Sequence, residues 1–179
     1  MRLRSFAAAA TLWSGAIAAT AAQAAQPVTV CVAPRDAEAI VTLIAPDLIR
    51  LTATMCAPNL PAGAYLRRPA DQLAAKYAVN SDGAWPVARA ALRNLLTPEA
   101  AQMIEGDFAR PLIGSLLAPM IAKEIKPADC ESIDRVLGLI DPLPPRNTIG
   151  LIVTIAQLAQ RKQQPKGGFV ICEPGTIKP

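Results

Sequence analysis

Apolar residues recur at helical spacing along residues 36–55, the first strongly patterned segment of the chain. Successive members are four, four, three and four residues apart, which places them on one face of a helix. They are Ile40, Ile44, Leu48, Leu51 and Met55. Pro46 lies inside this segment, where a proline removes a backbone hydrogen bond and costs about 3 kcal/mol. Because the stripe keeps its phase across Pro46, we expect a kinked helix, with a complete break as the alternative.

Three further helical patterns are bounded by prolines. The first covers residues 69–79, and its apolar side holds Leu73, Ala74 and Tyr77. The second begins near Trp85 and Pro86, since proline suits the first turn of a helix. Its inward residues are Val87, Ala88, Ala91, Leu92, Leu95 and Leu96. A later helix is expected over 111–125, opened by Pro111.

Between these segments, residues 97–106 carry the local signals of a helix start. Thr97 is a suitable N-cap, Pro98 suits the first helical position, and Glu99 lies near the positive end of the helix dipole. We expect Gly106 to end this helix.

Residues 130–163 combine two apolar helical patterns with a proline-rich turn. One face of the first pattern consists of Cys130, Ile133, Val136, Leu137 and Ile140. The turn DPLPP at 141–145 cannot continue a helix, because each proline forces the residue before it out of the helical conformation. Asn147 is a suitable cap for a second helix from Thr148 to about Arg161. The pattern predicts a helical hairpin.

The apolar run of the second helix extends from Ile149 to Ile155 and is interrupted only by Gly150 and Thr154. It is much shorter than the roughly 20 residues that a membrane span needs. We therefore expect this helix to be the most buried one in the protein and not to cross a membrane.

Two short segments resemble strands. PVTVCV at 27–32 alternates in polarity, and FVIC at 169–172 is rich in β-branched and aromatic residues. An isolated two-stranded ribbon is marginally stable. Each segment carries a cysteine, which could join the two.

The first 24 residues have the three-part layout of a secretory signal peptide. Arg2 and Arg4 precede the uncharged, alanine-rich stretch from Phe6 to Thr20, and small residues follow at Ala22 and Ala24. An uncleaved anchor is the alternative, but alanine and threonine make the stretch only weakly apolar. We expect cleavage after Ala24 and a periplasmic or secreted protein.

Removal of this segment leaves 179 − 24 = 155 residues, a length typical of one domain. Two arginines leave with it, so 18 − 2 = 16 basic residues face 14 acidic ones and the net charge is +2. A nucleic-acid-binding domain would need a stronger basic stripe. We expect residues 25–179 to form one helical domain that does not bind nucleic acid.

All four cysteines follow the predicted signal peptide, and an even number in an exported chain indicates two disulfides. Local pairing would join Cys31 to Cys56 and Cys130 to Cys172. A helix over 36–55 would be about 30 Å long, whereas the Cα atoms of a disulfide lie within about 7 Å. We therefore favour the nested pairing of Cys31 with Cys172 and Cys56 with Cys130, although a break at Pro46 would restore the local one.

The chain contains no histidine, the usual base beside a serine or cysteine nucleophile. Ser115 and Lys123 are about two helical turns apart, too far for an obvious Ser–Lys dyad. Several acids lie near predicted helix ends, where carboxylates commonly cap, namely Glu99, Glu105, Asp107, Asp129 and Glu131. We expect no catalytic residues and no cofactor, and the wide spacing of the cysteines argues against a metal site.

Basic residues cluster at Arg67-Arg68 and at 161–166. They could contact anionic headgroups or an acidic partner, but a solvated turn and a helix C-terminus are the favoured explanation. Trp85 could anchor a ligand or pack at a helix start. In being exported, helical and cysteine-paired, the chain resembles the saposin-like family, which implies lipid or membrane-surface binding. That family carries more cysteines in a shorter chain, so the resemblance is architectural and does not extend to membership.

These observations predict an all-α, disulfide-stapled domain of five to seven helices, possibly with a short ribbon joining the chain ends. The leading hypothesis for function is a non-enzymatic binding module of the cell envelope, for an unknown protein or a small apolar ligand. Membrane-surface binding is the alternative, and a carboxylate-dependent hydrolase is less favoured.

Overall fold

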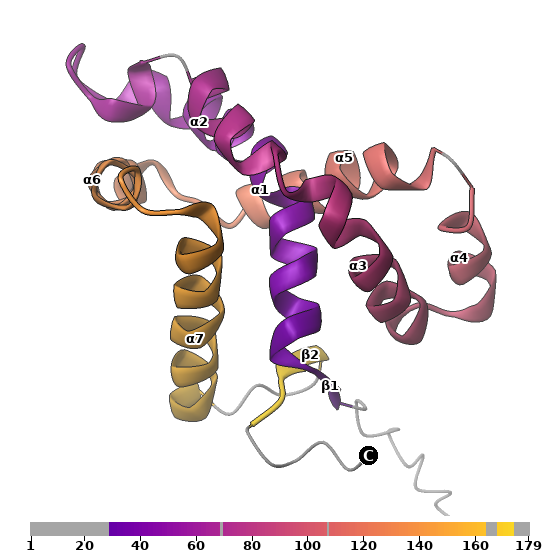
Figure 1. Ribbon diagram of the computed structural model, residues 1–179. Coiled ribbons are helices and arrows are strands. Elements are labelled where there is room, and N and C mark those ends of the chain that lie inside the picture. Colours follow the sequence, from indigo (N-terminus) through magenta and orange to yellow (C-terminus); the bar gives the residue numbers. More distant parts are fainter. Residues whose placement is uncertain (1–28, 69, 107, 164–167, 174–179) are drawn as a thin grey trace, which may run out of the picture.

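The computed structural model describes residues 29–68, 70–106, 108–163 and 168–173, and these form a mostly helical structure (Figure 1). The predicted signal peptide lies outside the described residues. The α-helices are α1 (Pro34–Cys56), α2 (Ala70–Ala78), α3 (Ser81–Leu95), α4 (Pro98–Met103), α5 (Ala109–Ala122), α6 (Cys130–Ile140) and α7 (Pro145–Gln163). Short 3-10 turns are η1 (Ala57–Asn59), η2 (Tyr65–Arg67) and η3 (Pro127–Asp129), and the strands are β1 (Thr29–Val32) and β2 (Gly168–Ile171).

The central element is α1, against which α2, α3, α5 and α7 pack (Figure 1). It runs without a break through Pro46, so the complete break that was the alternative does not occur. The buried surface of α1 is wider than the predicted stripe, because several helices contact it from different sides. Ile44 of the stripe is 3% exposed, whereas Met55 at its end is 37% exposed.

Three apolar clusters follow α1 along its length. The first packs Leu43 and Ile44 against α3 and α5. The second joins Ile49 to Tyr77 of α2 and Ile149 of α7. The third surrounds the disulfide at the C-terminal end of α1. Burial of hydrocarbon at about 25 cal/mol per Å² makes these clusters the main source of stability.

Helix boundaries differ from the prediction at two prolines: Pro86 was expected in the first turn of a helix, and Pro145 in a turn before one. α3 begins at Ser81, so Pro86 lies inside the helix. α7 begins with Pro145 itself, and Asn147 therefore lies in its first turn and does not cap it. Pro145 suits this position because its missing N–H has no helical partner in the first turn.

The capping prediction at Thr97 is confirmed. The Thr97 hydroxyl accepts a hydrogen bond of 3.4 Å from the N–H of Ala100, and Pro98 is the first residue of α4. The pKa of the Glu99 carboxyl is lowered by two hydrogen bonds. The larger effect comes from the bond to its own backbone, and the smaller from the bond to the Thr97 side chain. The helix ends at Met103, three residues before Gly106.

The prediction that α7 is the most buried helix is wrong. Thr148, Ile149 and Val153 are buried, but Leu151 and Ile155 on the same helix are 47% and 55% exposed. The helix packs on α1 and β2 along one side only. The most extensively buried helix is α1, because it alone is surrounded by other helices.

The expected hairpin of α6 and α7 is also altered. The chain does turn at Pro142–Pro144, but α6 packs mainly on η2 and η3 whereas α7 packs on α1 and β2. Figure 1 shows α6 almost end-on while α7 runs down the page. The two helices therefore diverge and leave part of α1 uncovered between them.

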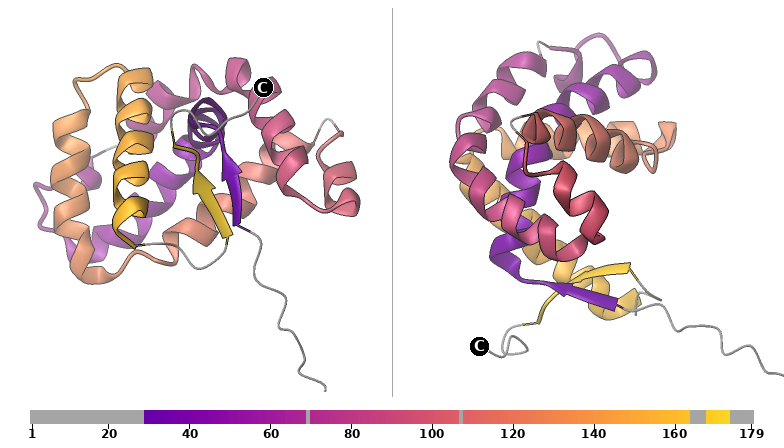
Figure 2. Two further views of the ribbon diagram at one scale, coloured as in Figure 1. Left: turned by 90° about the horizontal axis from the view of Figure 1, so that it is seen from below. Right: turned by 90° about the vertical axis from the view of Figure 1, so that its right-hand side faces the viewer.

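The two strands join the N- and C-terminal regions of the described chain, as expected for a ribbon. They are parallel, with Cys31 opposite Val170, and they lie side by side at the N-terminal end of α1 (Figure 2). A disulfide joins Cys31 to Cys172, with the Cα atoms 5.0 Å apart. The second joins Cys56 to Cys130 at 5.3 Å. This is the nested pairing.

Side chains of α7 support the ribbon from one side. Gln160 Oε1 accepts a hydrogen bond of 2.8 Å from the N–H of Ile171, and Gln157 Nε2 donates one of 2.7 Å to the carbonyl of Cys172. Arg161 pairs with Glu173 at 3.0 Å. Because two strands alone are marginal, the disulfide and these glutamines explain how so short a ribbon persists.

Among the described residues, one helical segment is long and apolar enough to span a membrane, Pro34–Asn59, which includes α1. Half of its apolar window is buried inside the protein. A central helix of a folded domain has this character.

Candidate ligand groove

An apolar groove lies where α1 is left uncovered between α6 and α7. Its volume is about 330 Å³, within the range of about 300–1,000 Å³ that is usual for small-molecule sites. One wall is a face of α1, formed by Val41, Ile44, Ala45, Leu48, Ile49 and Thr52. The other walls are formed by Tyr77, Ile121, Ile125, Ile133, Leu137, Ile140, Ile149 and Ile152. None of these lining residues is charged.

Helical periodicity places the groove-facing residues of α1 together. Val41, Leu48 and Thr52 are seven and four residues apart, so they lie on one side of the helix. The facing residues of α6, Ile133, Leu137 and Ile140, are half-buried for the same reason. Divergence of α6 and α7 prevents these hydrocarbon surfaces from closing on each other.

Besides Thr52, Tyr77 is the polar residue that lines this groove. Its side chain comes from α2, packs with Ile49 and Ile149, and is 3% exposed. Its hydroxyl is the buried side-chain polar atom, among the described residues, that has no hydrogen-bond partner. Nearly all buried hydroxyls in proteins are hydrogen-bonded, so this one requires an explanation.

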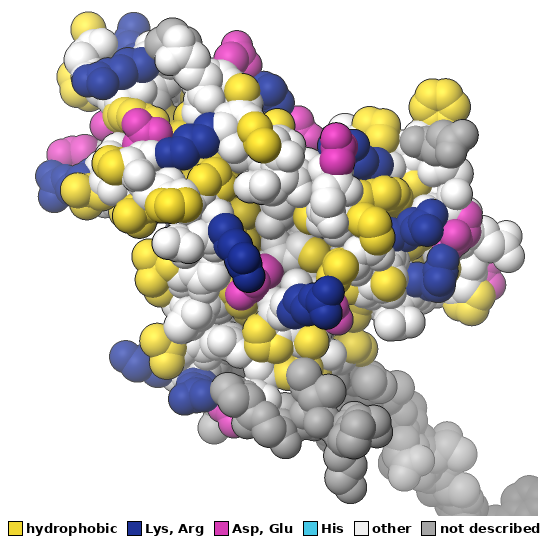
Figure 3. Space-filling view, in the orientation of Figure 1, with side chains coloured by type: hydrophobic (Ala, Val, Ile, Leu, Met, Phe, Trp, Pro, Cys, Tyr) yellow, Lys and Arg dark blue, Asp and Glu magenta, His cyan; other side chains and the backbone are white. Residues whose placement is uncertain are grey.

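The outer face of α7 is also apolar. Leu151, Ile155 and Leu158 follow one another at spacings of four and three, and they are 47%, 55% and 52% exposed. On α6, Leu139 is 70% exposed. Figure 3 shows hydrophobic side chains over both helices, interspersed with basic and acidic ones. Hydrophobic residues that gather on one face of a soluble protein commonly mark an interaction surface.

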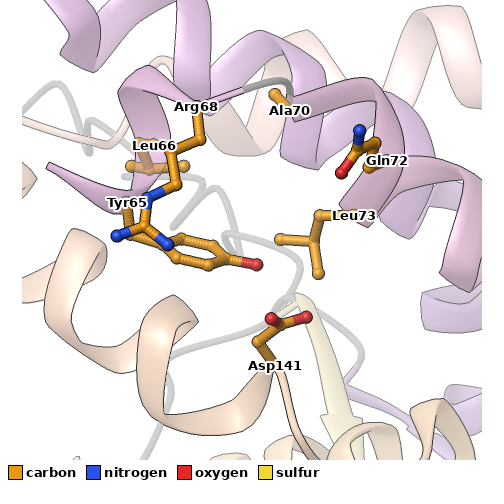
Figure 4. A pocket seen from close by; sticks show the side chains of 7 residues that line it. All are labelled: Tyr65, Leu66, Arg68, Ala70, Gln72, Leu73 and Asp141. Atoms are coloured by element: carbon orange, nitrogen blue, oxygen red, sulfur yellow. The ribbon is translucent and has the colours of Figure 1, made fainter. Parts of the chain in front are cut away.

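A second, polar pocket of about 260 Å³ lies between η2, α2 and the end of α6. In Figure 4 the Tyr65 ring lies beneath the Arg68 side chain, and its hydroxyl is directed toward Asp141. Arg68 is 5.9 Å from the ring centroid. Lys76 binds Asp141 as well, with its ammonium 3.7 Å from Oδ1.

Burial, followed by the charge and hydrogen bonding of Asp141, raises the pKa of Tyr65 to about 12. A tyrosine with this pKa stays protonated at neutral pH and is a poor acid or base there. The polar contacts in this pocket therefore hold η2, α2 and the end of α6 together.

The serine and lysine considered for catalysis have local structural roles. The Ser115 hydroxyl donates a hydrogen bond of 2.9 Å to the carbonyl of Leu112 on the same helix. Lys123 is exposed at the C-cap of α5. The hydroxyl thus already has a backbone acceptor, as is usual for serine in helices.

The candidate carboxylates are dispersed. Glu105 pairs with Arg93 and Arg89, Asp129 accepts a 2.9 Å hydrogen bond from the N–H of Lys126, and Glu131 lies 4.0 Å from Arg135. Asp107 lies outside the described residues. The apolar groove contains none of these acids, and the polar pocket contains one carboxylate, that of Asp141.

The basic residues and Trp85 are mainly structural too. Arg67 donates 3.1 Å hydrogen bonds to the carbonyls of Ala57 and Leu60. These bonds join η2 to η1 and to the residue that follows it. Trp85 packs half-buried against the first apolar cluster. Part of the basic segment 161–166 lies outside the described residues.

Sequence reasoning identified neither the groove nor the unpartnered hydroxyl of Tyr77. Tyr77 was correctly placed on the buried side of its helix, but its unpartnered hydroxyl is visible only in three dimensions.

No group of acidic, cysteine or histidine side chains suited to a metal ion occurs in the described ranges. The geometry defines a helical domain with an apolar groove. Comparison of the chain with protein-family models, curated proteins and solved structures gives no match.

Proposed function

We propose that this protein is a non-enzymatic binding module of the cell envelope that holds a small apolar ligand in the groove between α1, α6 and α7. The observation that carries the proposal is the groove lining, which consists of aliphatic side chains, one threonine and one tyrosine. Displacement of water from an exposed apolar concave surface by an apolar ligand is favourable, and this stabilises the complex. Export to the periplasm or beyond is supported by two disulfides, which persist in oxidising compartments.

Two adjacent residues of α7 provide a matched pair for the test. Ile152 lines the groove and is 44% exposed, whereas Leu151 does not line it and is 47% exposed. A glutamate at either position adds the same charge to the same helix. Only Ile152→Glu places that charge at the groove, where an apolar ligand would have to desolvate it.

The experiment measures binding of the uncharged fluorophore N-phenylnaphthylamine to the folded, oxidised protein. We expect saturable binding, a loss of affinity of about tenfold or more in Ile152→Glu, and a change of less than about twofold in Leu151→Glu. Circular dichroism of both variants checks that the helices are retained. Absence of binding to the wild type, or equal losses in both variants, would contradict the proposal.

Membrane-surface binding is a second candidate, supported by the exposed apolar stripe Leu151, Ile155 and Leu158 on the outer face of α7. A helix that lies in a membrane interface needs such a stripe. The same pair of variants separates the two functions in a vesicle flotation assay. If α7 inserts into the interface, Leu151→Glu should reduce flotation more than Ile152→Glu does.

A further inference from the structure

We propose that the Cys31–Cys172 disulfide is a site of thiol–disulfide exchange, at which a low-molecular-weight thiol attacks the sulfur of Cys31 and opens the bond while Cys56–Cys130 stays intact. This goes beyond the proposed function and does not depend on what the groove binds. It is carried by the contrast in exposure between the two disulfides and by a pocket beside the first.

The first step concerns access to the two disulfides. Cys31 is exposed in the ribbon, which lies at one end of the molecule (Figure 2). Cys56 and Cys130 are 0% and 2% exposed inside the third apolar cluster. The rate of exchange depends on how easily a thiolate reaches a sulfur atom. A thiol can therefore reach the first bond in the folded protein, whereas the second becomes accessible only when the core opens.

The second step concerns the space beside the first disulfide. A pocket of about 350 Å³ is lined by Cys31 and Cys172 and by side chains from the C-terminal part of α7. This volume lies within the range that is usual for small-molecule sites, so a small thiol can enter. Gln157 and Gln160 also line the pocket. Each is bonded to the ribbon through one end of its amide, and the other end can bind a polar reductant.

The third step is the exchange reaction. The thiolate of the reductant attacks Cys31 Sγ, the S–S bond breaks, and Cys172 leaves as a thiolate that takes up a proton. A second thiol then attacks the reductant's sulfur in the mixed disulfide and releases Cys31, which is protonated in turn. The reductant gives up two electrons and two protons and leaves as its own disulfide. Cys31 is the sulfur attacked, because Cys172 is 5% exposed.

The structural consequence of exchange is confined to the ribbon. The reduced ribbon would keep its hydrogen bonds to α7 and the 2.8 Å bond from the Cys172 N–H to the Val32 carbonyl. Two strands alone are marginally stable, so we expect the reduced ribbon to open readily. Neither Cys31 nor Cys172 belongs to the three apolar clusters, so the helices should keep their packing.

The test treats the folded, oxidised protein with dithiothreitol, quenches samples with N-ethylmaleimide and maps the modified cysteines by mass spectrometry. The buried disulfide is the internal control. We expect the initial rate of modification at Cys31 and Cys172 to be at least about hundredfold higher than at Cys56 and Cys130. In urea above the unfolding transition the two rates should become similar. Circular dichroism of the selectively reduced protein should retain the helical signal.

Two further measurements test direct attack at the pocket. In urea well below the transition, the rate at Cys31–Cys172 should change by less than about twofold. With glutathione in place of dithiothreitol, the mixed disulfide trapped by acid in early samples should be on Cys31. Similar rates at the two disulfides of the folded protein, a steep rise in dilute urea, or a mixed disulfide mainly on Cys172 would overturn the proposal. None of these results depends on ligand binding in the groove.

Discussion

The Ser81 hydroxyl donates a 3.3 Å hydrogen bond to the carbonyl oxygen of Thr42, four residues before Pro46. In an α-helix this oxygen accepts a hydrogen bond from the N–H of residue 46. Proline has no N–H, so the central helix would otherwise contain an unsatisfied carbonyl at this point. Ser81, which is 3% exposed at the start of α3, replaces the missing donor. The continuity of α1 and the position of α3 are thus linked.

We predict that Ser81→Ala lowers the free energy of unfolding by about 1–2 kcal/mol, because it leaves a partly buried carbonyl unpaired. In the Pro46→Ala background, residue 46 can donate to Thr42 itself, so the same change should cost markedly less. Urea unfolding of the four proteins in this cycle gives the coupling energy. Ser115→Ala removes an exposed hydroxyl and should cost less than about 0.5 kcal/mol. Additive effects of the two changes would show that Ser81 does not compensate for Pro46.

The two disulfides are expected to contribute unequally. Their sequence separations are 141 and 74 residues, and the loop-entropy model gives each about 4–5 kcal/mol, with a difference of less than about 1 kcal/mol. Packing therefore decides which loss is worse. Cys56 is 0% exposed and Cys130 2% exposed within the third apolar cluster, whereas Cys31 is exposed.

We predict that the double change Cys56→Ala and Cys130→Ala destabilises the protein more than the double change Cys31→Ala and Cys172→Ala. Thermal unfolding of both variants measures the difference. Peptide mapping without reduction should recover peptides that link Cys31 to Cys172 and Cys56 to Cys130. A peptide that links Cys31 to Cys56 would contradict the nested pairing.

Stability should decrease at alkaline pH because of Tyr65. Its pKa is about 12 in the folded protein and 10.0 for the free side chain. The unfolded chain therefore loses this proton at lower pH than the folded protein. The contribution is fully present below pH 10 and is lost as the pH rises toward 12. Because Tyr65 is partly exposed to solvent, screening limits this contribution to about 1–2 kcal/mol.

Because the chain contains two tyrosines, Tyr77→Phe leaves Tyr65 as the one phenol to titrate. Ultraviolet absorbance of tyrosinate in that variant should give a midpoint well above 10. In Tyr65→Phe, the loss of stability between pH 10 and 12 should be smaller than in the wild type. A midpoint near 10 would mean that Asp141 and burial do not perturb this group.

Removal of the Tyr77 hydroxyl should not destabilise the ligand-free protein. Tyr77→Phe keeps the buried ring and removes a donor that has no partner among the described residues. We expect the free energy of unfolding to be unchanged or raised by up to about 1 kcal/mol. Denaturant unfolding of delipidated protein measures this. A loss of more than 1 kcal/mol would show that the hydroxyl is bonded within the folded chain.

Much of the helical organisation followed from local patterns. Thr97 and Pro98 define the start of α4 because capping depends on a few adjacent residues. The side of α2 that holds Leu73, Ala74 and Tyr77 was likewise predictable from spacing. The nested disulfides could be favoured because a continuous helix separates Cys31 from Cys56 by its own length.

Tertiary structure decided what each apolar surface meets. The sequence of α7 is apolar on two sides and was interpreted as the most buried helix, yet Ile149 and Val153 pack on the protein while Leu151, Ile155 and Leu158 face outward. Which side is covered depends on how α6 and α7 diverge after Pro142–Pro144. The groove depends on the same divergence, because its lining residues come from five helices and from the segment after α5, which are distant from one another in sequence. Local periodicity determines which residues share a face, but the long-range packing of those faces determines whether they close into a core or remain open to a ligand.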